Sequence, residues 1–115
     1  MTSIFADLIL KAYTGFNERN IQDVFDLMNP DVLWPKAFEG GHVQGFEAVR
    51  EYWLRQWSEI NPKVDPVAVT DREDGKVEVL VHQVVKSLDG TILFDGETRH
   101  IFTFADGLIQ RMDIE

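Results

Sequence analysis

One histidine lies in a segment whose same-face positions are mostly apolar. Residues 92–104 alternate, and the alternation puts Phe94, His100 and Phe102 on one face of a strand. An imidazole can accept a proton near neutral pH, which an ordinary lysine or carboxylate does poorly. On an apolar wall it would suit a general base. The pattern therefore predicts His100 as the catalytic residue, with a hydrogen-bonded structural histidine as the alternative.

The segment before His100 predicts the strand that pairs with it. Residues 77–85 alternate, and Asp89-Gly90 is a hairpin signal between the two segments. A two-residue turn there places Val79 opposite His100. Gln83 then lies on the same face, where its amide could donate a hydrogen bond to a substrate carbonyl.

A carboxylate beside His100 would raise its basicity and fix its tautomer. A two-residue turn at Asp106-Gly107 places Asp113 opposite His100 and predicts a catalytic His100–Asp113 dyad. A three-residue turn with a glycine bulge, equally natural for this sequence, places Met112 there instead. Both alternatives stay open from the sequence.

Large apolar groups gather in NPDVLWPKAFEGGHVQG, residues 29–45, a segment that cannot be one regular helix. They could plug a core or rim a pocket, and the second interpretation predicts a ligand site. The predicted ligand-binding residues are Trp34, Phe38, Trp53, Gln83, Phe102, Phe16 and Tyr13. His42 is expected to face solvent and His82 to lie on the outer face of the sheet.

Composition restricts the kinds of partner and cofactor that the protein could bind. The net charge is −9, and scattered basic residues form no stripe, so nucleic acid is not expected as a partner. The chain has no cysteine and no metal-ligand spacing, and no cofactor motif is present, so neither metal nor cofactor is expected. No apolar run approaches the roughly 18 residues of a membrane span. We expect a cytoplasmic protein with one domain, residues 1–115.

Periodicity divides the chain into a helical half and a strand half. Helices are predicted at residues 4–16, 20–28 and 46–60, and strands at 31–35, from 64, 76–88, 92–104 and 108–114. Thr2 or Ser3 could cap the first helix, and Pro66 predicts an edge strand for the segment from 64. This order predicts an α+β domain whose antiparallel sheet curls around the helices.

The motifs PDVLWP, VQGFEAVREYW and FTFADGLIQRMDI, in this order, resemble the SnoaL-like group of the nuclear transport factor 2-like superfamily, which is related to ketosteroid isomerases and polyketide cyclases. The resemblance implies a cone-shaped curved antiparallel sheet wrapped around an N-terminal three-helix layer, with a pocket inside the cone. It also implies an isomerase- or cyclase-type enzyme acting on a small hydrophobic molecule, or a non-catalytic binder of the same fold.

The ketosteroid isomerase residues are not matched. That site uses a tyrosine, an aspartate base and a protonated aspartic acid. The aligned positions of this chain hold Ala12, Lys36 and His100, while Tyr13 is about 100° away from Ala12 around the helix.

The outer face of the predicted sheet suggests a second contact. An apolar centre of Leu80, Val84 and Ile101 is surrounded by charged or polar groups, a pattern typical of interfaces. The resemblance favours a homodimer through this face. The surrounding residues are Glu78, His82, Lys86, Glu97 and Arg99.

Overall fold

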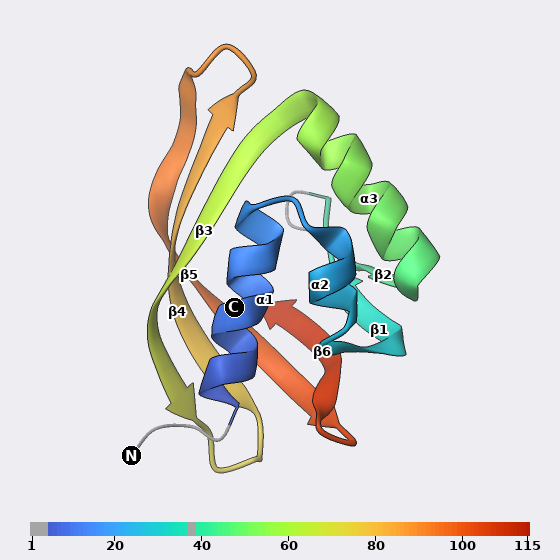
Figure 1. The fold of residues 1–115 in the computed structure, drawn as a ribbon. Helices are drawn as coiled ribbons and strands as arrows, with labels where there is room; N and C mark the ends of the chain where they lie inside the picture. The colour runs from blue at the N-terminus through green and yellow to red at the C-terminus, as the bar shows by residue number, and fades with distance from the viewer. Residues whose placement is uncertain (1–4, 37–38) are drawn as a thin grey trace.

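A six-stranded sheet of order β2-β1-β6-β5-β4-β3 curves around the helices (Figure 1). The computed structural model describes residues 5–36 and 39–115. The helices are α1 (Ala6–Asn17), α2 (Ile21–Phe25) and α3 (Phe46–Glu59). The strands are β1 (Met28–Pro35), β2 (His42–Gln44), β3 (Ile60–Asp71), β4 (Val77–Ser87), β5 (Ile92–Ala105) and β6 (Leu108–Ile114). The predicted α+β class with a curved sheet is confirmed.

The sheet departs from the prediction at its β1 edge. β1 runs parallel to β6, whereas the other neighbouring strands are antiparallel. The second helix ends at Phe25, and Asn29 and Pro30, predicted to follow it as a stop, lie inside β1. The irregular pairing between Met28 and Leu33 explains how Pro30 fits there, because a bulge requires no ladder donor. Residues 42–44, predicted as loop, form β2.

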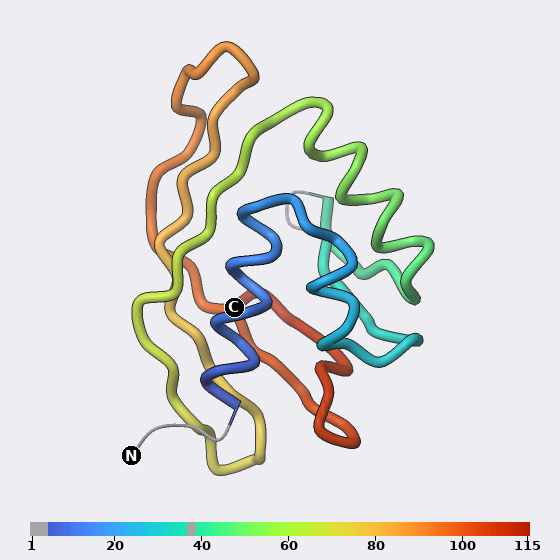
Figure 2. Tube along the Cα trace, viewed as in Figure 1, coloured from blue at the N-terminus to red at the C-terminus, as the bar shows by residue number. Residues whose placement is uncertain are grey.

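The first helix lies in the concavity of the sheet (Figures 1 and 2). Its predicted cap at Thr2 or Ser3 lies outside the described residues. Gly15 lets α2 approach closely, since a Cβ there would lie only 2.8 Å from Cγ2 of Val24. At the helix end, the Asn17 side chain exchanges hydrogen bonds with both the N–H and the C=O of Val64. Asn17 therefore fixes α1 against β3.

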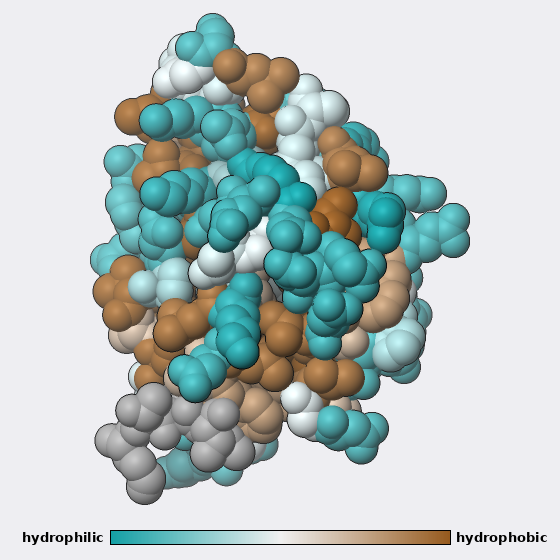
Figure 3. Space-filling model, viewed as in Figure 1, coloured by the Kyte–Doolittle hydropathy of each residue, from teal (hydrophilic) through white to brown (hydrophobic). Residues whose placement is uncertain are grey.

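An aromatic cluster joins the helices to the sheet. Trp53 of α3 is fully buried, and its ring centroid lies 5.4 to 5.7 Å from those of Trp34, Phe16 and Phe25. Leu54, next to Trp53 in α3, is exposed. Hydrophilic residues cover much of the helical side of the molecule (Figure 3).

The two long hairpins set the register of the inner wall. Val79 pairs with His100 as predicted, although the hairpin closes through a longer loop in which Ser87 N–H donates to Thr91 O. A bulge between the Lys86–Ile92 pair and the Val85–Phe94 pair restores the predicted register. The segment with Pro66 is an edge strand, as predicted, and the ladder is irregular between Pro66 and Ala68.

Candidate functional site

A cavity of about 60 Å³ lies between α1, α3 and the inner face of the sheet. It is small beside the roughly 300–1,000 Å³ of most small-molecule pockets. Its walls are mainly apolar, because α1 and the inner face of β4 and β5 both turn their hydrophobic residues inward. The lining residues are Ala12, Tyr13, Phe16, Val24, Trp34, Pro35, Tyr52, Gln56, Pro62, Val64, Gln83, His100, Phe102, Met112 and Ile114.

A tyrosine–histidine pair forms the polar centre of this cavity. The hydroxyl of Tyr13 lies 2.7 Å from Nδ1 of His100, and both side chains are buried. The two rings are also nearly parallel, with centroids 5.9 Å apart. Within the described part of the chain no hydrogen bond reaches Nε2 of His100, so this nitrogen is the one left for a ligand.

Burial sets the protonation of both groups. It lowers the pKa of His100 to about 4, because the imidazolium would lose its hydration. It raises the pKa of Tyr13 well above its usual value for the same reason, since the phenolate is the charged form. At neutral pH the pair therefore consists of a neutral imidazole and a neutral phenol, which can exchange donor and acceptor roles.

The predicted pairing of Asp113 with His100 is wrong. The turn at Asp106-Gly107 has two residues, as expected, and Ala105 pairs with Leu108. A register shift between Thr103 and Phe104 then moves every later pair by one residue, so Ile114 lies opposite His100 and Asp113 lies opposite Ile101. The alternative with Met112 opposite His100 is wrong as well. A one-residue shift turns a side chain to the other face of a sheet.

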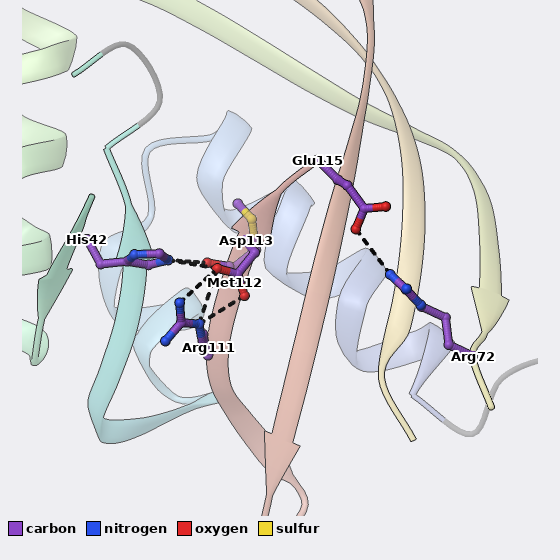
Figure 4. A network of polar contacts seen from close by, with 6 residues as sticks. All are labelled: His42, Arg72, Arg111, Met112, Asp113 and Glu115. Carbon is purple, nitrogen blue, oxygen red and sulfur yellow. Dashed lines mark hydrogen bonds and ion pairs between the residues drawn. The ribbon is translucent and has the colours of Figure 1, made fainter. Parts of the chain in front are cut away.

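Asp113 instead belongs to a separate polar network (Figure 4). Its carboxylate accepts bidentate hydrogen bonds from the guanidinium of Arg111. An oxygen of the same carboxylate lies 3.0 Å from Nε2 of His42. Arg111 is the first cause of the lowered pKa of Asp113. His42 is half-buried and also contacts the carbonyl of Met112, so the prediction that it faces solvent is wrong. His82 is exposed on the outer face, as expected, and contacts Asp95.

Most of the predicted ligand-binding residues line the cavity. They are Tyr13, Phe16, Trp34, Gln83 and Phe102. Trp53 does not line it; its ring is fully buried behind Trp34 and Phe16. Phe38 lies outside the described residues.

Sequence reasoning missed Tyr52 and Gln56 on α3, and the Tyr13–His100 hydrogen bond. The i, i+4 spacing of Tyr52 and Gln56 was a usable signal, because such residues share one face of a helix. Tyr13 was predicted to bind ligand but not to match the isomerase tyrosine, because it lies about 100° from Ala12 around the helix; yet both residues are buried and line the cavity. A helix enclosed by a concave sheet buries a wide arc of its surface, so this angular argument fails.

No described helix is long and apolar enough to cross a membrane. No curated protein matches the chain. Among solved structures, TerC co-crystallised with polyporic acid has a TM-score of 0.84 and 28% identity, and the match covers 98% of this chain and 91% of that one.

Two further solved structures are similar in fold. An NTF2-like protein of unknown function from Burkholderia pseudomallei has a TM-score of 0.84 and 19% identity, covering 99% of this chain and 91% of that one. A candidate polyketide cyclase from Sinorhizobium meliloti has a TM-score of 0.80 and 19% identity, covering 95% and 94%. The family model for the SnoaL-like domain matches residues 9–112. The chain therefore belongs to the SnoaL-like domain family.

Proposed function

We propose that the protein is an isomerase- or cyclase-type enzyme that moves a proton on a hydrophobic, oxygenated small molecule. The observation that carries this proposal is the buried 2.7 Å hydrogen bond between the Tyr13 hydroxyl and Nδ1 of His100 in an otherwise largely apolar cavity. Membership of the SnoaL-like family and likeness to candidate polyketide cyclases support it.

The roles follow from the tautomer of His100. With the proton on Nδ1, this nitrogen donates to the Tyr13 oxygen and Nε2 is free to act as the base. Nε2 takes a proton from the carbon next to a substrate carbonyl, and the C–H electron pair moves toward the carbonyl oxygen. The Tyr13 hydroxyl then donates to the developing enolate oxygen. Return of the proton from Nε2 to another carbon gives isomerisation. In cyclisation the carbanion forms a C–C bond with a second carbonyl, whose π electrons move to its oxygen, and this alkoxide takes the proton back from Nε2.

Tyr13 replaces Gln83 as the proposed donor to the enolate. Gln83 lies four residues along β4 from Val79, the partner of His100, which is roughly 13 Å along the strand. Asp113 has no orienting contact with His100 in the observed register, so the proposed base acts with Tyr13 alone.

A ring compound is the proposed ligand class. The 28% identical neighbour TerC was co-crystallised with polyporic acid, and aromatic side chains line this cavity. A cavity of about 60 Å³ admits a ring system only after lining side chains move. The half-buried Phe16, Trp34 and Gln56 are the candidates for this movement.

A non-catalytic ligand binder of the same fold is the second candidate. It is favoured by the lowered pKa of His100, about 4, since so weak a base removes protons from carbon slowly. In the enzyme reading, the developing negative charge on the substrate raises the pKa of the imidazole during the reaction. The two readings therefore differ in whether bound ligand exchanges its carbon-bound protons.

Deuterium exchange distinguishes the two candidates without knowledge of the product. β-Dicarbonyl and steroid-like ketones are incubated with the protein in D₂O, and loss of the α-proton signal is followed by NMR. His100→Asn should slow exchange by about 10²-fold or more, and Tyr13→Phe should slow it as well. His82→Asn, at the exposed outer face, is the matched control and should exchange as the unaltered protein does. Equal rates for His100→Asn and the unaltered protein contradict the proposal.

A further inference from the structure

The cavity lining that the structure describes carries no fixed charge. None of its described lining residues is Asp, Glu, Lys or Arg, although the chain as a whole carries a net charge of −9. The nearby cation Arg19 is already engaged, because it donates to Asn61 and to the carbonyl of Pro62 and lies over the Trp57 ring. A ligand carboxylate in this cavity would therefore lack a partner.

Two glutamine amides also line the cavity, in addition to the hydroxyls of Tyr13 and Tyr52 and the imidazole of His100. Gln56 comes from α3 and Gln83 from β4, and neither amide has a hydrogen-bond partner within residues 5–36 and 39–115. Each amide can both donate and accept hydrogen bonds, and neither carries a charge. Such groups recognise hydroxyl, ketone or amide functions in a ligand.

The register separates Gln83 from the Tyr13–His100 pair. Val79 lies opposite His100, and Gln83 lies roughly 13 Å further along β4. The lining between and around these polar groups is apolar, including Phe16, Trp34 and Phe102. Along the sheet wall of the cavity, Gln83 and His100 are thus two separate polar positions with apolar residues around them.

We propose that this site selects an uncharged ring compound with a hydrogen-bonding group at each end, and that Gln56 and Gln83 are its specificity-determining residues. One end meets Tyr13 and His100; the other, a hydroxyl, ketone or amide, meets the two glutamines. Acidic ligands enter in their protonated form. Burying an unpaired carboxylate in an apolar cavity is strongly unfavourable, because the charged group loses its hydration, and the negative charge of the chain adds repulsion. The proposal rests on the proposed function in that it concerns the same cavity.

Three naphthalene probes test the proposal by calorimetric titration at neutral pH: 2-naphthol, 2,6-dihydroxynaphthalene and 6-hydroxy-2-naphthoate. The diol should bind about fivefold more tightly than 2-naphthol, because it gains a hydrogen bond at the second end. The carboxylate should bind at least about tenfold more weakly than the diol.

Variants of Gln56 and Gln83 test whether these two residues bind the second hydroxyl group of the diol. Gln56→Leu and Gln83→Leu should each reduce the ratio of diol affinity to 2-naphthol affinity, measured within the same variant. Gln44→Leu, an exposed position on β2, is the matched control and should keep the full advantage. Circular dichroism confirms that each variant is folded.

Three results would overturn the proposal: the carboxylate binding as tightly as the diol, the diol keeping its advantage in both glutamine variants, or no probe binding at all. Failure of the proposed catalysis gives a different result, in which probes bind with the expected preferences but ketones show no deuterium exchange. The opposite result is also possible: deuterium exchange depends on His100, but the probes bind equally well. This result would support the proposed catalysis and contradict the proposed role of the two glutamines in selecting the ligand.

Discussion

The Tyr13 hydroxyl and Nδ1 of His100 form a buried hydrogen bond of 2.7 Å between α1 and β5, 87 residues apart in the chain. Each group supplies the polar partner that the other needs in an apolar environment. An unpaired hydroxyl or imidazole in this position would lose its hydration without compensation. The pair therefore stabilises the packing of α1 in the sheet as well as forming the polar centre of the cavity.

The first prediction concerns stability at mildly acidic pH. Burial lowers the pKa of His100 to about 4, below the value of about 6.5 for an unfolded chain. The contribution of neutral His100 to the free energy of unfolding is thus fully present above about pH 6.5. It is lost as pH falls toward 4, because in this range the imidazole of His100 is protonated only in the unfolded chain. A pKa difference of this size between the folded and unfolded chain corresponds to a loss of about 3 kcal/mol in the free energy of unfolding. Urea denaturation between pH 7 and pH 4 measures it.

The matched variants for this prediction are His100→Asn and His82→Asn. The free energy of unfolding of His100→Asn should be lower at neutral pH and should change less between pH 6.5 and 4. His82→Asn should keep the slope of the unaltered protein, because His82 is exposed. A slope that is the same in His100→Asn would show that other groups cause it.

The second prediction concerns the contact between α1 and α2. Gly15→Ala should lower the free energy of unfolding by about 1–3 kcal/mol, because the added Cβ would lie 2.8 Å from Val24 Cγ2. Helix propensity alone would favour alanine by about 1 kcal/mol, so the sign of the change is informative. A double-mutant cycle with Val24→Ala should show a favourable coupling energy. Stabilisation by Gly15→Ala would contradict the close contact.

Most helices and strands of the meander were predictable, because their apolar residues repeat at the period of the element. The β4–β5 register was also correct, even though the turn that produces it was not. An Asp-Gly pair fixes the approximate place of a hairpin, but a bulge can compensate for a longer loop, as the Val85–Phe94 and Lys86–Ile92 pairs show.

The site was less predictable because it depends on contacts between distant segments. A single shift at Thr103–Phe104 moved Asp113 away from His100, and no feature of the sequence marks this bulge. The position of Tyr13 depends on how deeply α1 sits in the sheet. β2 was missed because three residues next to a Gly-Gly pair carry too short a pattern to predict a strand.

The third prediction concerns Asp113. Asp113→Asn should leave the pKa of His100 unchanged, since its carboxylate contacts Arg111 and His42 instead. The free energy of unfolding should fall by about 1 kcal/mol or less, as is usual for partly exposed ion pairs. An NMR pH titration of the imidazole signals measures the first effect. A clear change in the His100 titration would restore a role for Asp113 beside the histidine.

The last prediction concerns self-association, which we propose occurs through the outer face of β4 and β5. Ile101, the predicted centre of this face, is only 3% exposed in the single chain, so a charge there would test folding more than association. Leu80 is half-buried and pairs with Arg99 across the ladder, which makes Leu80→Glu the better probe.

Light scattering at micromolar concentration should report about twice the monomer mass of 13.2 kDa for the unaltered protein. Leu80→Glu should weaken the dimer, because a charge would be buried without a partner in the contact. Leu54→Glu, at an exposed position on α3, is the control and should remain dimeric. A monomer at every concentration for the unaltered protein, or a dimer that Leu80→Glu leaves intact, would exclude this face as the interface.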